Sequence, residues 1–335
     1  MTIDSQALHD EAIIIDAVCP LLRLKDKIAD YQQGGVTAIV PTMATSQNAH
    51  TSLAEIGRWH KIIRDNDSLV LIRTAADLRA AKAAGKTGVV LHFQGTAPLE
   101  DKLEFIDAFK AAGVGVMQLA YNTKNLIGDG AEERTDSGMS RFGIKAIARM
   151  NQAGVIVDCS HTGHRTALDA VEFSSAPVVI SHANPRAVHD NPRNIPDDLI
   201  KAIAGTGGTI GVVGFPAFVS TDKRPTMDQF IDHIAYLGDL VGIDHVTLGI
   251  DYFQGQYPYI PDDHAMQLYQ FLLASGDWSE ASYPPPPYYY PEGIETPKTL
   301  TALTAALLKR GFTAEEIKKI YGENWLRIYE TVWGA

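Results

Sequence analysis

The sequence contains only two cysteines, Cys19 and Cys159, among 335 residues. This excludes a disulfide scaffold and a zinc module built from cysteines. No apolar segment reaches the roughly 18 residues that span a bilayer. The first residues carry no Lys or Arg ahead of a short apolar run, which Asp16 interrupts, so they do not resemble a secretion signal. We therefore expect a soluble cytoplasmic protein in a reducing compartment.

Basic residues are scarce relative to acidic ones. The chain has 29 Lys and Arg against 40 Asp and Glu, a formal net charge of -11 at pH 7. Because this excess repels phosphate backbones and anionic lipids, we expect neither nucleic acid nor a membrane as partner. Hydrophobic residues make up 45% and charged residues 21%, which is enough for a core and excludes disorder of the whole chain. We expect a small-molecule substrate.

Eight short runs rich in Val, Ile and Leu recur along the chain. Each is nearly continuous rather than alternating with polar residues, which is typical of parallel strands buried on both faces. The runs are Ile13–Val18, Thr37–Met43, Val89–Phe93, Val114–Leu119, Val155–Cys159, Val178–Ser181, Thr209–Val213 and Val246–Ile250.

Amphipathic stretches with helical spacing lie between the runs, and glycines such as Gly113 and Gly154 precede the next strand. Clear examples are Leu53–Asn66, Leu103–Ala112, Gly143–Ala153 and Asp197–Gly205. Repeated strand–helix units without a break in composition predict an α/β fold, a single closed (β/α)8 TIM-like barrel covering residues 1–335. The alternative, an open doubly wound sheet, usually has a Gly-rich loop after its first strand, and no glycine follows Val18 here.

Residues 252–291 depart from this repeat. They combine many Tyr, Phe and Trp residues with the proline run Pro284–Pro287. Loops of this length are usually functional or disordered, and the aromatic content disfavours disorder. We expect an insertion that forms either a lid over the barrel mouth or a subunit contact.

In such barrels the active site lies at the carboxyl ends of the strands. His161 and His182 end two neighbouring runs. Adjacent strands lie about 4.8 Å apart, so the two imidazoles can converge on one point. They are candidates for zinc ligands or acid–base groups. The alternative is a pair of hydrogen-bonded residues at a loop entrance.

Other strand ends supply further candidates. Asp251 ends the eighth run and is a candidate general base, metal ligand or structural cap. Tyr121 and Asn122 follow the fourth run, and Gln94 follows the third. Arg193 lies just beyond the sixth strand, where it could hold a substrate carboxylate through a bidentate contact or form a surface salt bridge.

Eight short segments, spread over nearly the whole chain, form an ordered pattern. They are Asp158–His161, Ile180–His182, Pro192–Asp197, Leu248–Asp251, Met150–Asn151, Pro291–Gly293, Leu308–Phe312 and Gly322–Arg327. Taken in their order along the chain, they resemble the membrane (renal) dipeptidase family.

The resemblance implies an amidohydrolase-like (β/α)8 barrel, typically dimeric, that cleaves dipeptides with two zinc ions. It implies that His161 and His182 bind one zinc ion. It also implies that Asp251 is the catalytic aspartate and that Arg193 holds the substrate carboxylate. We accordingly expect a homodimer.

Four positions depart from the family pattern. The family's first strand carries Asp-Gly-His-x-Asp, whose last His and Asp bind the other zinc, but Val18 and Pro20 stand there in this chain. The glutamate that bridges the two zinc ions corresponds to Gln94, and a histidine that polarises the substrate corresponds to Tyr121. Valine and proline cannot ligate through their side chains, and a neutral glutamine is a weak donor. We therefore expect one zinc ion at most, or none.

A third ligand for that ion would come from Asp251, Gln94 or His92. We expect a hydrolase with this reduced site, acting on a small amide or dipeptide-like carboxylate, and the lost positions argue against ordinary dipeptidase activity. The alternatives are a metal-independent acid–base or lyase-type enzyme on the same barrel, and a non-catalytic small-molecule-binding homologue. The expected roles are catalysis for Asp251 and Tyr121, metal binding for His161 and His182, and substrate binding for Arg193, Gln94 and Asn122.

Overall fold

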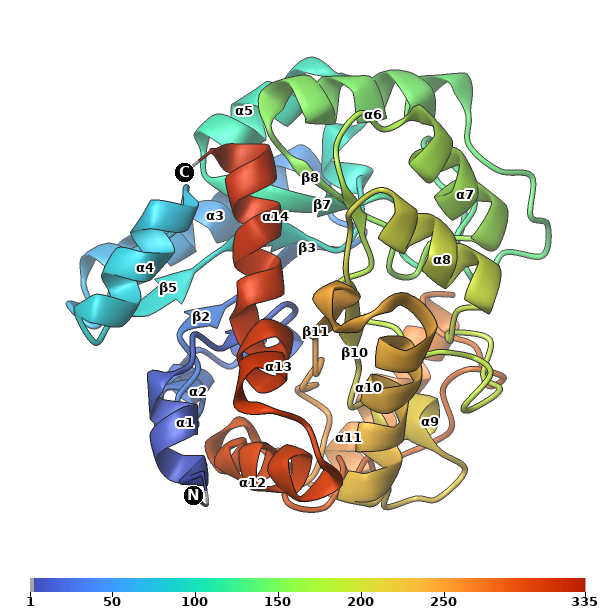
Figure 1. The fold of residues 1–335 in the computed structure, drawn as a ribbon. Coiled ribbons are helices and arrows are strands. Elements are labelled where there is room, and N and C mark those ends of the chain that lie inside the picture. Colours follow the sequence, from blue (N-terminus) through green and yellow to red (C-terminus); the bar gives the residue numbers. More distant parts are fainter. Residues whose placement is uncertain (1–2, 335) are drawn as a thin grey trace.

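Short parallel strands form the centre of the computed structural model, which describes residues 3–334 (Figure 1). They are β1 (Ile15–Asp16), β2 (Ala38–Ile39), β3 (Thr42–Ala44), β4 (Leu69–Leu71), β5 (Thr87–Val89), β6 (Leu91–Phe93), β7 (Val114–Gln118), β8 (Ile156–Asp158), β9 (Val178–Val179), β10 (Ile210–Val212) and β11 (Val246–Leu248). Each of the eight predicted runs contains or overlaps one or two of these strands. Strand β4 is an addition that the sequence did not predict.

Hydrogen bonds close the strands into a ring. The sheets have the orders β1-β2-β5-β4, β3-β6-β7-β8-β9 and β10-β11. Strand β2 leads into β3 and β5 leads into β6 after one or two residues, so the first sheet continues directly into the second. A parallel bridge between Ile180 and Ile210 joins β9 to β10, and the Ala17 N–H donates to the Leu248 carbonyl at 3.2 Å, which joins β1 to β11. The predicted (β/α)8 barrel is confirmed, with β4 paired to β5 as an extra strand.

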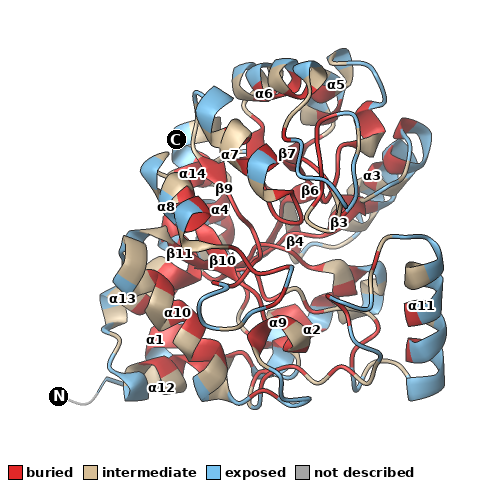
Figure 2. Cartoon of the chain, turned by 90° about the vertical axis from the view of Figure 1, so that its right-hand side faces the viewer, coloured by how far each residue is buried: buried red, intermediate tan, exposed pale blue. Residues whose placement is uncertain are grey.

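Helices surround the strands, with buried faces inward and exposed faces outward (Figure 2). They are α1 (Ser5–Glu11), α2 (Ile28–Gln33), α3 (Ala49–Arg64), α4 (Ala75–Ala83), α5 (Glu104–Ala111), α6 (Arg141–Ala153), α7 (His164–Phe173), α8 (Asp197–Gly205), α9 (Pro216–Val219), α10 (Met227–Val241), α11 (Asp262–Ala274), α12 (Thr301–Arg310), α13 (Ala314–Lys318) and α14 (Asn324–Trp333). The four predicted amphipathic stretches correspond to α3, α5, α6 and α8. Helix α6 shows why these boundaries hold, because the Ser140 side chain accepts from the Gly143 N–H at its start and Gly154 ends it at φ 69°.

One end of the barrel interior is filled by apolar side chains. Ile15, Val116 and Ile156 from the strands form a buried cluster with Trp325 and Tyr329 of α14. Polar residues follow the strands at their carboxyl ends, so this packing leaves the opposite end of the barrel for a site. No helix between residues 3 and 334 is both long and apolar enough to cross a membrane.

Residues 252–291 contain helix α11, which lies at the exposed edge of the molecule (Figure 2). The rest of the segment packs through aromatic rings. Phe215, which follows β10, has ring neighbours at centroid distances from 5.0 to 6.4 Å in Phe253, Trp278, Tyr283, Tyr288 and Tyr290. The segment is therefore anchored to the barrel by a buried aromatic cluster.

Candidate active site

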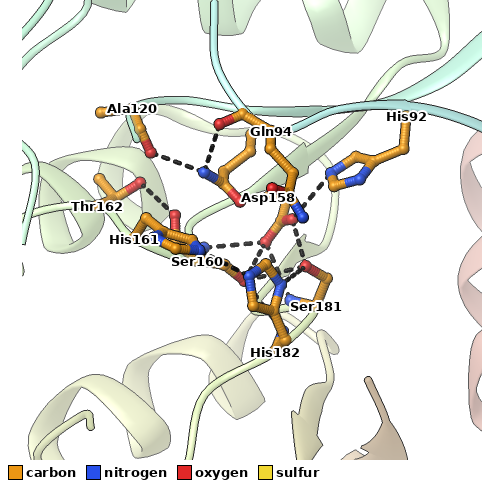
Figure 3. Close-up of polar contacts among 10 residues, drawn as sticks. His92, Gln94, Ala120, Asp158, Ser160, His161, Thr162, Ser181 and His182 are labelled. Carbon is orange, nitrogen blue, oxygen red and sulfur yellow. Dashed lines mark hydrogen bonds and ion pairs between the residues drawn. The ribbon is translucent and has the colours of Figure 1, made fainter. Parts of the chain in front are cut away.

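The carboxylate of Asp158, at the end of β8, organises the buried side of the site (Figure 3). Its Oδ1 accepts from the Ser160 N–H at 2.9 Å, the Ser160 hydroxyl at 2.8 Å and the Ser181 N–H at 2.9 Å. Its Oδ2 accepts from the Ser181 hydroxyl at 2.5 Å and lies 3.4 Å from His92 Nε2. Burial by itself would raise the pKa of Asp158, but His92 and Ser181 hold it well below its ordinary value. The carboxylate is therefore ionised and ties β8 to the end of β9.

His161 and His182 meet above this carboxylate. Their Nε2 atoms lie 2.8 Å apart, and both side chains are buried. His161 Nδ1 lies 2.7 Å from Asn122 Oδ1, and His182 Nδ1 lies 2.7 Å from the Ser181 hydroxyl oxygen. The prediction that the two imidazoles converge is confirmed by this geometry.

The hydrogen bonds around the two rings determine where their protons lie. The Asn122 amide nitrogen donates to the Asp277 carbonyl at 2.7 Å and to Tyr283 Oη at 3.1 Å, so Asn122 Oδ1 must accept from His161 Nδ1–H. The Ser181 hydroxyl gives its one proton to Asp158, so its oxygen must accept from His182 Nδ1–H. Each Nε2 is then left with a lone pair, and the two lone pairs face each other.

Both histidines are uncharged at neutral pH. Burial lowers the pKa of His182 to about 3, with the charge of Arg193 acting in the same direction and that of Asp158 opposing it. Burial also lowers the pKa of His161 well below its ordinary value, and Arg193 adds to the effect. Two neutral imidazoles with facing lone pairs repel at 2.8 Å, and a cation bound by both nitrogens would relieve that repulsion.

Aromatic side chains cover the two histidines. Tyr121 stacks on His161 with ring centroids 4.2 Å apart, and its hydroxyl accepts from Trp278 Nε1 at 3.2 Å. Trp278 in turn stacks on Tyr283 at 4.2 Å. Burial raises the pKa of Tyr121 well above its ordinary value, and electrostatic interaction with Tyr283 adds to this. Tyr121 therefore remains a protonated phenol at neutral pH.

Asp251 lies at the end of the eighth strand, and Asp16 of β1 positions it. Asp16 Oδ1 accepts from the backbone N–H of Ile250 at 2.8 Å. Burial raises the pKa of Asp16 to about 7 against the hydrogen bonds from Ile250 and Val18. Burial also raises the pKa of Asp251 well above its ordinary value, with Arg193 lowering it and Asp16 raising it. Such a carboxyl group suits proton transfer near neutral pH.

Three site residues have left-handed backbone conformations. Among residues 3–334, the non-glycine residues with positive φ are Glu100, Asn122 at 56°, His161 at 57° and Asp251 at 62°. This conformation costs roughly 1 kcal/mol or more outside glycine and persists where surrounding structure enforces it. The strained backbone at Asn122, His161 and Asp251 thus lowers the stability of the fold but orients these three side chains.

A cavity of about 240 Å³ opens beside these groups. Its wall includes Gln94, Tyr121, His161 and Asp251 from the barrel. The 252–291 segment contributes Phe253, Gln254, Leu268, Phe271, Leu272, Ser275, Asp277, Trp278 and Tyr283. The segment therefore forms one wall of the cavity at the barrel mouth, as a lid would.

Arg193 and His161 both line a second cavity, of about 210 Å³. Arg193 is 3% exposed, and its Nε donates to Tyr283 Oη at 3.1 Å. Its Nη2 has no hydrogen-bond partner among residues 3–334. A surface salt bridge, the alternative expected from sequence, does not describe a buried guanidinium of this kind.

The remaining predicted residues lie as follows. Gln94 is 4% exposed, lines the larger cavity and leaves its Nε2 without a partner in the described chain. Asn122 is fully buried behind His161 and uses its amide on His161, Asp277 and Tyr283. Its proposed contact with substrate stays a prediction, and the observed contacts give it a positioning role. His92 lies next to Asp158, on the other side of it from the histidine pair (Figure 3).

Sequence reasoning did not assign roles to Asp158, Ser181, Asp16, Trp278 and Tyr283. Asp158 and Asp16 could have been found, because each ends a predicted strand with a carboxylate. Ser181 directly precedes His182. The two aromatic residues carry no local signal, since they reach the site from more than 100 positions away along the chain.

His161 and His182 have the surroundings that metal-ligating histidines usually have. Ligating histidines usually donate their other N–H to a carbonyl or carboxylate-linked group, as His161 does to Asn122 and His182 does to Ser181. Val18 and Pro20 offer no side-chain donor where a second ion would need them. In the described part of the chain, no group of three or more His, Cys, Asp or Glu side chains could hold a metal ion. The two Nε2 atoms could serve as ligands to a metal ion.

Comparisons with known proteins agree with this architecture. A solved amidohydrolase from Pseudomonas aeruginosa superimposes with a TM-score of 0.90 at 33% identity, covering 99% of this chain and 100% of that one. A metallo peptidase from Rhodobacter sphaeroides, solved with a phosphinate mimic of the dipeptide L-Ala-D-Ala, has the same fold, with a TM-score of 0.78 at 19% identity over 96% of this chain and 100% of that one.

Curated relatives point the same way. The dipeptidase verJ of Clonostachys rogersoniana is 27% identical over 292 residues, which are 86% of this chain and 67% of the relative. An uncharacterized dipeptidase of Schizosaccharomyces pombe is 31% identical over 198 residues, 57% of this chain and 48% of that protein. The chain thus spans about half to two thirds of the length of the curated relatives it matches. The family model described as membrane dipeptidase, peptidase family M19, matches residues 18–282. With this match over most of its length, the chain belongs to the membrane dipeptidase family of hydrolases.

Proposed function

We propose that the chain hydrolyses a small amide or dipeptide-like substrate that carries a carboxylate, with at most one divalent metal ion at the site. The observation that carries the proposal is the pair of neutral imidazoles whose Nε2 atoms face each other at 2.8 Å beside the cavity. When bound, a metal ion would polarise the scissile carbonyl or activate water. His161 and His182 would hold it.

Asp251 is the proposed general base. It lines the cavity with His161, and its raised pKa brings proton uptake closer to neutral pH. Asp251 takes a proton from the attacking water as the water oxygen bonds to the carbonyl carbon. It then gives that proton to the leaving nitrogen as the C–N bond breaks. The water thus supplies both the new carboxylate oxygen and the proton on the amine.

Tyr121 is proposed to donate a hydrogen bond to the substrate oxygen. Its hydroxyl oxygen already accepts from Trp278 Nε1, and its raised pKa keeps the phenol protonated. Its own proton is then available to the carbonyl oxygen, where negative charge develops. Stacking on His161 fixes the ring in this position.

Arg193 is proposed to hold the substrate carboxylate. A buried guanidinium with an unpartnered Nη2 is costly unless an anion completes its hydrogen bonds. Its charge also reaches Asp251, whose pKa it lowers. Binding a carboxylate at Arg193 therefore weakens that effect and strengthens the base at the moment the substrate is present.

The test is hydrolysis of a panel of dipeptides and N-acyl amino acids, with and without added zinc. Asp251→Asn should lower the rate by about 10²–10⁴-fold. The matched control Asp263→Asn, at an exposed position on α11, should leave it unchanged. Absence of hydrolysis of every member, or equal rates for Asp251→Asn and the native chain, would refute the proposal. Formation of a product by elimination rather than hydrolysis would favour the lyase-type alternative.

A further inference from the structure

The cavity wall around Pro20, one of the two positions where the family pattern has metal ligands and this chain has none, carries hydrogen-bond donors. Pro20 and Arg23 are the first and last residues of a 3-10 helix, and both line the 240 Å³ cavity. Residues three apart in such a helix lie on the same face. The chain that lacks a ligand at Pro20 therefore brings a guanidinium to the same wall.

Two buried donors lie in that wall as well. Gln94 Nε2 is buried and has no hydrogen-bond partner among residues 3–334, and the same is true of Thr42 Oγ1. Both residues line the cavity with Arg23. An unpartnered buried donor costs about 1–3 kcal/mol, so the wall is built for a ligand that accepts hydrogen bonds.

The surroundings add positive charge. Arg23 and Thr42 also line a neighbouring cavity whose wall contains Lys25, Glu55 and Arg58. Glu55 pairs with Lys25 and with Arg58, each at 2.7 Å, and Arg23 belongs to neither pair. The cluster therefore carries three cations against one carboxylate, on a chain whose net charge is -11.

Two carboxyl groups also line the 240 Å³ cavity. Asp251, the proposed general base, is one of them. Asp277 follows helix α11 on the lid side, and its Oδ2 accepts from the Ser275 hydroxyl at 3.0 Å. Asp251 follows β11 and Asp277 follows α11, so both come from other segments of the chain than Arg23, Thr42 and Gln94.

We propose that Arg23, Gln94 and Thr42 form a subsite for a second carboxylate of the substrate. This deepens the proposed function, on which it rests: the substrate is a small amide with two carboxylates, one for Arg193 and one for this subsite. A planar guanidinium flanked by two neutral donors matches a carboxylate, whose two oxygens accept a few hydrogen bonds in one plane.

Binding of inert ligands tests the subsite without hydrolysis. Calorimetry compares unbranched dicarboxylates of four to eight carbons with monocarboxylates of equal length, in protein freed of metal. At least one dicarboxylate should bind tenfold or more tightly than its monocarboxylate. Arg23→Gln should remove that advantage, and Gln94→Glu should reverse it by adding a negative charge. Arg141→Gln, which alters an exposed arginine at the start of α6, should retain the advantage.

The outcomes separate the subsite from the proposed function. The subsite is refuted if no dicarboxylate has an advantage, if the advantage survives Arg23→Gln, or if phosphonate analogues bind tighter than the dicarboxylates. Arg23 is exposed, so its replacement leaves the core intact, and matching melting temperatures verify this. A dicarboxylate advantage in a chain that hydrolyses no amide would retain the subsite and refute the hydrolase.

Discussion

His161 Nε2 lies 2.8 Å from His182 Nε2, and the hydrogen bonds on the far side of each ring leave a lone pair on both atoms. The pair is neutral because burial lowers the pKa of each ring. The protein therefore holds two good ligands in a high-energy arrangement that a cation relieves. The groups that accept the two Nδ1 protons, Asn122 and Ser181, should therefore affect how tightly a metal ion binds.

Asn122 should control that affinity without touching the metal ion. Asn122→Gly removes the carbonyl that accepts from His161 but tolerates the positive φ of 56°. We expect zinc to bind about 10–100-fold more weakly, measured by competition with a chromophoric chelator. Asn122→Asp keeps an acceptor at the same place and should retain the native affinity. Equal affinities for the native chain and the glycine variant would contradict the inferred proton positions.

Asp158 should be a major contributor to stability. Asp158→Asn replaces one of two carboxylate oxygens, which accept four hydrogen bonds, by an amide nitrogen that faces donors. We expect a loss of about 3 kcal/mol in the free energy of unfolding, from urea denaturation at pH 7. Asp101→Asn, at an exposed position, should change it by less than about 0.5 kcal/mol. A loss below 1 kcal/mol at Asp158 would contradict its organising role.

His233 should make the fold sensitive to acid. It is fully buried, and burial lowers its pKa to about 4. Between about pH 6.5 and pH 4, His233 is protonated in the unfolded chain but neutral in the folded protein. The free energy of unfolding therefore falls as the pH drops from 6.5 towards 4. The cost is about 2 kcal/mol at pH 5. His233→Gln keeps an N–H for the Val219 carbonyl and should lose about that much less between pH 7 and 5. Parallel stability curves for the two proteins would show that His233 does not cause the effect.

Restoring the lost ligands should create a second metal position. Val18→His, Pro20→Asp and Gln94→Glu together supply an imidazole and two carboxylates at the mouth of a site that already holds His161 and His182. We expect a second bound zinc ion and faster hydrolysis of simple dipeptides than by the native chain. Removing Pro20 also frees the local backbone, so the gain in activity should be partial.

Adding Asp251→Asn to the triple variant is the control, and it should abolish the gained activity while leaving the second zinc ion bound. Vigorous zinc-dependent cleavage of simple dipeptides by the native chain would contradict our interpretation of these four positions.

Much of this site could be predicted because it is built on strand ends. The runs that end at His161 and His182 are continuous in apolar residues, so their positions in the barrel follow from the sequence. Strand β4 could not be predicted in this way, because Leu69–Leu71 is short, partly exposed and pairs outside the ring. Its structure depends on the edge of β5 rather than on its own pattern.

The surroundings of the histidines were beyond sequence reasoning for a different reason. Tyr283 contacts Asn122 although the two are 161 positions apart in the sequence. Trp278 contacts Tyr121 across 157 positions. The left-handed backbone of Asp251 is enforced by neighbouring structure, such as the Asp16 side chain and the Tyr290 hydroxyl, which donates to the Asp251 carbonyl. No local propensity encodes such contacts.

The number of zinc ions bound per native chain tests the central claim most directly. Elemental analysis after saturation with zinc and removal of the excess should give one ion per chain, and none in the His161→Ala, His182→Ala double variant. Two ions in the native chain, or one ion that survives the double replacement, would contradict the account.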